Sequence, residues 1–149
     1  MTLAVIIVDH GSRRDESNRL LTELATLFAS KYADRFPIVE SAHMELAEPS
    51  ISTAFARCID RGAGRVVVMP FFLGPGKHWN EDIPRLVQAA AARFPRIETT
   101  VTEPLGIHDL LLRLIATRID ERLAATVGSR GVVTPGGNGA GCEDFDDAL

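Results

Sequence analysis

Four short apolar runs alternate with four amphipathic stretches along the chain, and this alternation restricts the possible folds more than any other feature. Two of the runs, at residues 3–8 and 66–69, contain no polar side chain. Uninterrupted apolar runs of this length are typical of strands that are buried on both faces, as in the middle of a parallel sheet. The runs at residues 38–46 and 97–101 mix apolar with polar side chains, which indicates edge strands with one wetter face.

The stretches between and after these runs carry apolar side chains at the spacing of an α-helix. The four apolar stripes fall within residues 20–32, 51–59, 83–94 and 111–119. Alternation of strands and helices predicts right-handed parallel crossovers. The sequence therefore predicts an α/β fold, a three-layer α/β/α sandwich whose four-stranded parallel sheet has the order 2-1-3-4.

The composition along the chain predicts one folded domain followed by a tail. The 149 residues are 46% hydrophobic and 24% charged, a balance that suits one buried core. The strand and helix patterns stop near residue 127, and the residues that follow are rich in glycine and acidic side chains. We therefore expect a folded domain over residues 1–126 and a disordered, solvated tail over residues 127–149.

Charge and cysteine content argue against several classes of protein. The formal net charge of −4 disfavours nucleic acid or an anionic membrane surface as the main partner. Cys58 and Cys142 are far apart, so neither a disulfide scaffold nor a cysteine-based zinc site is expected. No apolar run approaches the roughly 20 residues of a membrane span, and the first residues lack the basic region of a signal peptide. We expect a cytoplasmic protein that binds neither nucleic acid nor membrane.

Two histidines follow the two strands predicted to be central, where the winding of the chain reverses. His10 comes soon after the run at residues 3–8, and His78 follows the run at residues 66–69 through a glycine-containing loop. Ligands bind at such a switch point, outside the carboxyl ends of parallel strands. Neutral imidazoles bind divalent first-row metals and accept protons near pH 7. We interpret His10 and His78 as candidate metal ligands across one crevice, with two ordinary loop histidines as the alternative.

Other polar residues lie beside these two loops or near the end of the second strand. Glu45 is a candidate third ligand or proton acceptor, or else an exposed edge-strand carboxylate, and His43 on the same face is a weaker candidate. Three cations, Arg13, Arg14 and Lys77, could hold carboxylates of an anionic ligand, although a solvated surface is their commoner place. The sequence contains no P-loop, dinucleotide fingerprint or serine-hydrolase motif, so neither nucleotide hydrolysis nor a dinucleotide cofactor is predicted.

Four segments, each following one of the predicted strands, resemble the small sirohydrochlorin chelatases of the CbiX type. They read VDHGSR at 8–13, MELAEPS at 44–50, PFFLGPGKH at 70–78 and EPLG at 103–106. The resemblance covers about residues 3 to 125. It implies a chelatase-like α/β fold and an ATP-independent lyase that inserts Co²⁺ or Fe²⁺ into sirohydrochlorin, in cobalamin or sirohaem biosynthesis.

The resemblance also implies roles for individual residues. His10 and His78 match the two metal-site histidines of the family, and Glu45 matches a carboxylate near the same cleft, so these three are the expected catalytic residues. The macrocycle is flat and rich in carboxylates, so its expected contacts are cationic or aromatic: Arg13, Arg14, Lys77, Phe72 and Trp79. The metal is then a substrate, and no permanently bound cofactor is expected.

The length of the chain bears on its partners. Longer members of the family fuse two such halves, so the resemblance implies that this short form pairs as a homodimer.

Two other functions are alternatives to the chelatase. A non-catalytic carrier of metal or tetrapyrrole is the first alternative, because it would use the same histidines. A metal-assisted hydrolase on a similar fold is the second, since fold alone does not fix function. Imidazole suits both cobalt and iron, so both metals stay open.

Overall fold

The computed structural model describes residues 1–74, 76 and 78–128, and for residues 78, 79, 127 and 128 it describes the main chain alone. These residues belong to two units, Met1–His108 and a second that begins at Asp109. The predicted tail at 127–149 lies outside the described residues except for its first two, which end the helix of the second unit. A domain boundary after residue 126 therefore stays a prediction.

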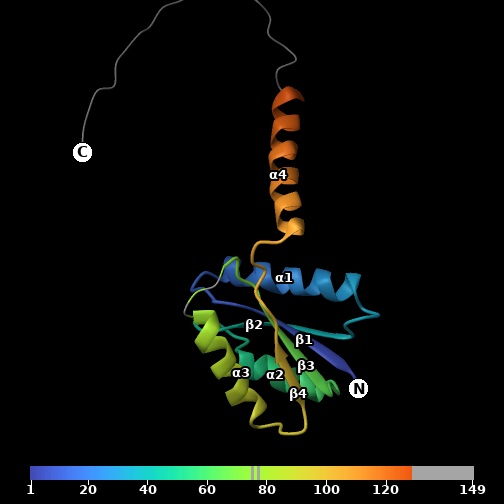
Figure 1. Cartoon of the computed structure of the whole chain (residues 1–149), viewed down its shortest axis with the longest axis vertical. Coiled ribbons are helices and arrows are strands. Elements are labelled where there is room, and N and C mark those ends of the chain that lie inside the picture. Colours follow the sequence, from blue (N-terminus) through green and yellow to red (C-terminus); the bar gives the residue numbers. More distant parts are fainter. Residues whose placement is uncertain (75, 77, 129–149) are drawn as a thin grey trace, which may run out of the picture. The chain divides into compact units, whose positions relative to one another are not determined.

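Four parallel strands form the sheet of the first unit (Figure 1). The strands are β1 (Leu3–Asp9), β2 (Ile38–His43), β3 (Arg65–Pro70) and β4 (Glu98–Val101). They lie in the order β2-β1-β3-β4, and every neighbouring pair is parallel. The predicted topology is confirmed: the two uninterrupted apolar runs are the central strands, and the two mixed runs are the edges.

Helices cover both faces of this sheet, which gives the three predicted layers. Helix α1 (Asp15–Lys31) lies on one face, and α2 (Ile51–Asp60) and α3 (Ile83–Ala91) lie on the other (Figure 1). A short π-helical turn, η1 (His78–Asp82), leads directly into α3. Ser50 caps the start of α2, where its side-chain oxygen accepts a hydrogen bond from the Thr53 N–H at 3.2 Å.

Strand β1 sends alternate side chains into two separate cores, because successive residues of a strand point to opposite faces. Ala4, Ile6 and Val8 pack with α2 and α3, and Val5 and Ile7 pack with α1. The largest fully buried side chain is Phe55 of α2, whose ring stacks on that of Phe94 with centroids 5.9 Å apart. The core between the sheet and helices α2 and α3 holds the strands in place, and the candidate site lies at the carboxyl ends of these strands.

Helix α4 (Asp109–Gly128) belongs to the second unit and carries many exposed apolar side chains. Six of them are at least half exposed: Leu110, Leu112, Leu114, Ile115, Ile119 and Leu123. None of the helices within the described residues is both long enough and apolar enough to cross a membrane. The exposed apolar surface of α4 is large for a helix in water. Exposed apolar patches of this kind typically mark interaction sites.

We predict that Phe55→Ala lowers the free energy of unfolding by about 3–5 kcal/mol, because it removes a large buried ring and leaves a cavity. Urea denaturation followed by circular dichroism measures the change. Leu27→Ala is the control, since Leu27 lies on α1 with 64% of its surface exposed and its truncation removes little buried area. A loss for Phe55→Ala no larger than for the control would contradict the described core.

Candidate functional site

The carboxyl ends of β1 and β2 lie side by side, and their pairing continues beyond the strands. Asp9 is in register with His43 at the end of the ladder. The Met44 N–H then donates to the Asp9 carbonyl at 2.9 Å, and the Glu45 N–H donates to the His10 carbonyl at 3.1 Å. The structure thus joins the main chains of two predicted site residues, His10 and Glu45, whose side chains are both exposed.

The end of β3 approaches His10 from the other side. The Phe71 N–H donates to the Val8 carbonyl at 2.7 Å, which extends the β1–β3 ladder by one residue. The ring of Phe72 then meets the His10 imidazole edge to face, with centroids 4.6 Å apart and an interplanar angle of 71°. Phe72 is also packed against the core, so this contact ties the His10 ring to the fixed part of the molecule.

Gly11 makes the close approach between the β1 and β2 loops possible. Its φ is +84°, a region that side chains other than glycine rarely adopt. A Cβ placed there would lie 2.0 Å from the Glu45 carbonyl oxygen and 3.0 Å from the His43 Cβ. The absence of a side chain at this position therefore lets the loop of His10 pack directly on that of Glu45.

Behind this junction, Asp9 and His43 form a partly buried side-chain pair. The His43 Nδ1 lies 2.5 Å from the Asp9 Oδ1, and the same oxygen accepts a hydrogen bond from the Gly11 N–H at 2.9 Å. The His43 side chain is 1% exposed and that of Asp9 is 25% exposed. From its place in the sequence, His43 is only a weak ligand candidate. The parallel register, which places Asp9 opposite His43, is the signal that reveals the pair.

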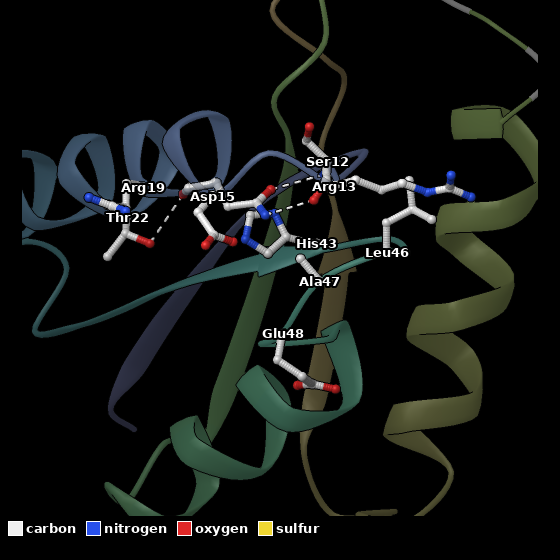
Figure 2. A pocket seen from close by; sticks show the side chains of 10 residues that line it. Ser12, Arg13, Asp15, Arg19, Thr22, His43, Leu46, Ala47 and Glu48 are labelled. Carbon is white, nitrogen blue, oxygen red and sulfur yellow. Dashed lines mark hydrogen bonds between the residues drawn. The ribbon is translucent and has the colours of Figure 1, made fainter.

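A cavity of about 400 Å³ opens beside this pair, against the first turns of α1 (Figure 2). Its lining consists of Ser12, Arg13, Asp15, Asn18, Arg19, Thr22, His43, Leu46, Ala47 and Glu48. Two hydrogen bonds hold its entrance loop, from the Ser12 N–H to the Asn18 Oδ1 at 2.9 Å and from the Asn18 Nδ2 to the Ser12 carbonyl at 2.8 Å. The cavity thus has a polar wall built on α1.

The cations of this region differ in their relation to the cavity. Arg13 lines it, whereas Arg14 is the exposed residue that precedes α1. Arg19, which the sequence analysis missed, lines it from the second turn of α1 (Figure 2). Among the described side chains, none of these three arginines takes part in an ion pair. Their guanidinium groups are therefore available to the carboxylates of a ligand.

Two further titratable groups lie near the ends of α2. Hydrogen bonds from the Ser50 main-chain N–H and the Thr53 side chain lower the pKa of Glu48, which adds a fixed negative charge to the cavity wall. Burial raises the pKa of the Cys58 thiol to about 12, and the nearby Glu40 carboxylate acts in the same direction. Cys58 is fully buried in the core as a neutral thiol and is not available as a metal ligand.

The remaining predicted site residues follow β3. Lys77 and the side chains of His78 and Trp79 lie outside the described residues, although the main chain of His78 begins η1. Among the side chains that the structure does describe, no three His, Cys, Asp or Glu residues come together as a set that could hold a metal ion. The pairing of His10 with His78 around one cation stays a prediction.

The comparisons with known proteins agree with this fold and these loops. The family model CbiX matches residues 4–122. The chain is 54% identical over 124 residues to the chloroplastic sirohydrochlorin ferrochelatase of Arabidopsis thaliana, covering 83% of this chain and 54% of that protein. It is 45% identical over 84 residues to the sirohydrochlorin cobaltochelatase of Methanocaldococcus jannaschii, covering 56% of this chain and 57% of that one.

A solved structure shows the same likeness in three dimensions. The structure of SirB from Bacillus subtilis with Fe³⁺ matches with a TM-score of 0.70 and 30% identity, over 81% of this chain and 47% of that one. A parallel sheet of this order, with polar loops at its carboxyl edge, defines the class of α/β proteins that bind ligands at a switch point. Within that class, the chain belongs to the CbiX family. It spans about half the length of the Arabidopsis thaliana enzyme and of the Priestia megaterium sirohydrochlorin ferrochelatase, and 94% of the length of the Saccharolobus solfataricus sirohydrochlorin cobaltochelatase.

We predict that Gly11→Ala lowers the free energy of unfolding by about 2 kcal/mol or more, because a Cβ there is strained by the positive φ and meets the Glu45 carbonyl oxygen. Gly74→Ala is the matched control, since a Cβ at Gly74 would meet no atom within 4 Å. Urea denaturation of both variants tests this. Equal stabilities of the two variants would show that the β1 and β2 loops do not pack as described.

Proposed function

We propose that this protein inserts Co²⁺ or Fe²⁺ into sirohydrochlorin without ATP. The observation that carries the proposal is the junction at the carboxyl ends of β1 and β2, where His10 and Glu45 share a main-chain hydrogen bond. An exposed imidazole and an exposed carboxylate held together supply a metal ligand and a proton acceptor at one place. Relatives named as ferrochelatase and cobaltochelatase support the same reaction, and they favour turnover over a mere carrier.

The proposed mechanism assigns a task to each residue. His10 and His78 bind the divalent metal and bring it, partly dehydrated, to the centre of the macrocycle. Two pyrrole N–H protons leave the ring as the metal enters, and Glu45 or one of the imidazoles accepts them. One divalent cation thus replaces two protons, so the net charge of the macrocycle is unchanged. Holding the metal and the ring together removes the entropic cost of their encounter.

The proposed macrocycle contacts are the cationic and aromatic groups beside these loops. Arg13 and Arg14 would pair with carboxylates of the ring, and Lys77 would approach from the loop after β3. Arg19 joins this set because it lines the same cavity as Arg13. Phe72, whose ring already contacts His10, would offer apolar surface to the flat face together with Trp79.

We predict that the purified protein accelerates Co²⁺ or Fe²⁺ insertion into sirohydrochlorin in the absence of ATP, followed by absorbance of the macrocycle. His10→Ala and His78→Ala should each lower the rate by about 100-fold or more, because each removes a metal ligand or a proton acceptor. The control is His108→Ala, since His108 is an exposed histidine on the segment before α4.

The assay separates the proposal from its alternatives. Near-normal rates for both His10→Ala and His78→Ala would show that the site is assigned to the wrong residues. Stoichiometric binding of metal or macrocycle without turnover would support a carrier instead. Comparing the rates with cobalt and with iron shows which of the two metals the site prefers. The cytoplasm is the proposed location, and a chloroplast is the alternative that the named plant relative raises.

We also propose that two copies of the chain pair as a homodimer. The chain spans about half the length of several relatives, so a second copy of the chain would take the place of the remaining half of those proteins. Helix α4 supports this, because six large apolar side chains on it are at least half exposed. Burying such surface is favourable by about 25 cal/mol per Å².

The homodimer predicts a mass near twice 16.2 kDa in light scattering after gel filtration. Replacing Ile115 and Ile119 together by glutamate should give monomers, because two carboxylates would be buried in the interface. Thr117→Glu is the control, since it adds a carboxylate at an exposed polar position of the same helix. A monomeric wild-type protein would contradict the proposal.

A further inference from the structure

The Asp9–His43 pair lies directly behind both residues of the proposed site. Asp9 immediately precedes His10, and His43 precedes Glu45 by two positions. The pair is less exposed than the proposed site: His43 is 1% and Asp9 25% exposed, whereas His10 and Glu45 are exposed. With so little exposed surface, His43 is poorly placed to bind a metal itself, and the structure suggests a supporting task for it.

Hydrogen bonds connect this pair to both loops. The Asp9 Oδ1 accepts from the His43 imidazole and from the Gly11 N–H, so one oxygen links β2 to the turn that follows His10. The main-chain carbonyl of Asp9 accepts from the Met44 N–H at 2.9 Å. The His43 N–H donates to the Pro49 carbonyl at 2.8 Å, at the far end of the second loop. Hydrogen bonds with Asp9 and His43 thus reach the His10 loop at Gly11 and the Glu45 loop at Met44 and Pro49.

We propose that Asp9 and His43 are positioning residues for metal binding, which hold His10 and Glu45 at a fixed separation as the metal enters and leaves. This inference rests on the function proposed above. Without the imidazole, Asp9 would lose the partner that fixes its carboxylate, and the Gly11 turn would keep only main-chain contacts with the end of β2. Groups that orient metal ligands without touching the metal typically contribute 10- to 100-fold in affinity or activity.

The test compares two substitutions of His43. His43→Leu fills the space but removes the ring nitrogen, and it should weaken Co²⁺ binding about 10- to 100-fold in calorimetric titration. His43→Asn keeps an amide N–H near the place of Nδ1 and should retain most of the affinity. The matched control is Ser41→Ala, because Ser41 is a buried polar residue on the same face of β2 that contacts Thr22 of α1.

Amide hydrogen exchange provides a readout that needs neither metal nor macrocycle. The Gly11 and Glu45 amides donate to Asp9 and His10, so both should exchange faster in His43→Leu than in the wild type. In His43→Asn and in Ser41→Ala they should exchange as in the wild type. A loss of protection throughout the sheet in His43→Leu would indicate general destabilisation and would overturn the inference.

A second variant keeps the inference testable if His43→Leu does not fold. Asp9→Ala removes the oxygen that accepts from both the His43 imidazole and the Gly11 N–H, so it should weaken Co²⁺ binding and speed exchange of the Gly11 amide while circular dichroism stays unchanged. Wild-type affinity and wild-type exchange in His43→Leu, or in Asp9→Ala where that variant replaces it, would show that Asp9 and His43 do not position the two loops. Absence of metal insertion by the wild type would instead defeat the proposed function, and the exchange measurement would still decide whether the pair holds the loops.

Discussion

The register of β1 between its two neighbours controls the position of every described residue of the candidate site. Asp9 is opposite His43 on one side, and Val8 is opposite Pro70 on the other. A shift by one residue would turn Ile6 and its neighbours in β1 from one core to the other and would separate His10 from Glu45. Both faces of β1 are buried in apolar cores, so such a shift is costly, and the burial of this strand therefore fixes the geometry at its carboxyl end.

The topology could be predicted from the sequence because burial leaves a direct mark on it. The runs at residues 3–8 and 66–69 contain only apolar side chains, and this identifies the two central strands. The neighbourhood of His10 and Glu45 followed from the same argument, since parallel strands end at one edge. The Asp9–His43 contact could not be predicted, because the mixed run at residues 38–46 permits more than one register and only the fold selects the observed one.

Two other features depend on contacts that periodicity does not determine. Arg19 reaches the cavity because α1 begins at Asp15, so that Arg19 lies on the second turn, and helix starts are poorly fixed by apolar spacing alone. For α4, the apolar side chains at 110, 111, 112, 114 and 115 point around much of the helix circumference. Such a distribution predicts a helix but does not single out the face that a partner would cover.

The proposed chemistry asks for a site that is open and rigid at the same time. A metal must reach His10 and Glu45 from solvent and leave again, which requires exposed ligands. It must also lose part of its hydration at a defined place, which requires that these ligands do not drift apart. The structure meets the two demands with different residues, some at the surface and some beneath it. In the proposed site, exposed residues would do the binding, and the glycine turn and the partly buried carboxylate–imidazole pair beneath them would supply the rigidity without closing the entrance.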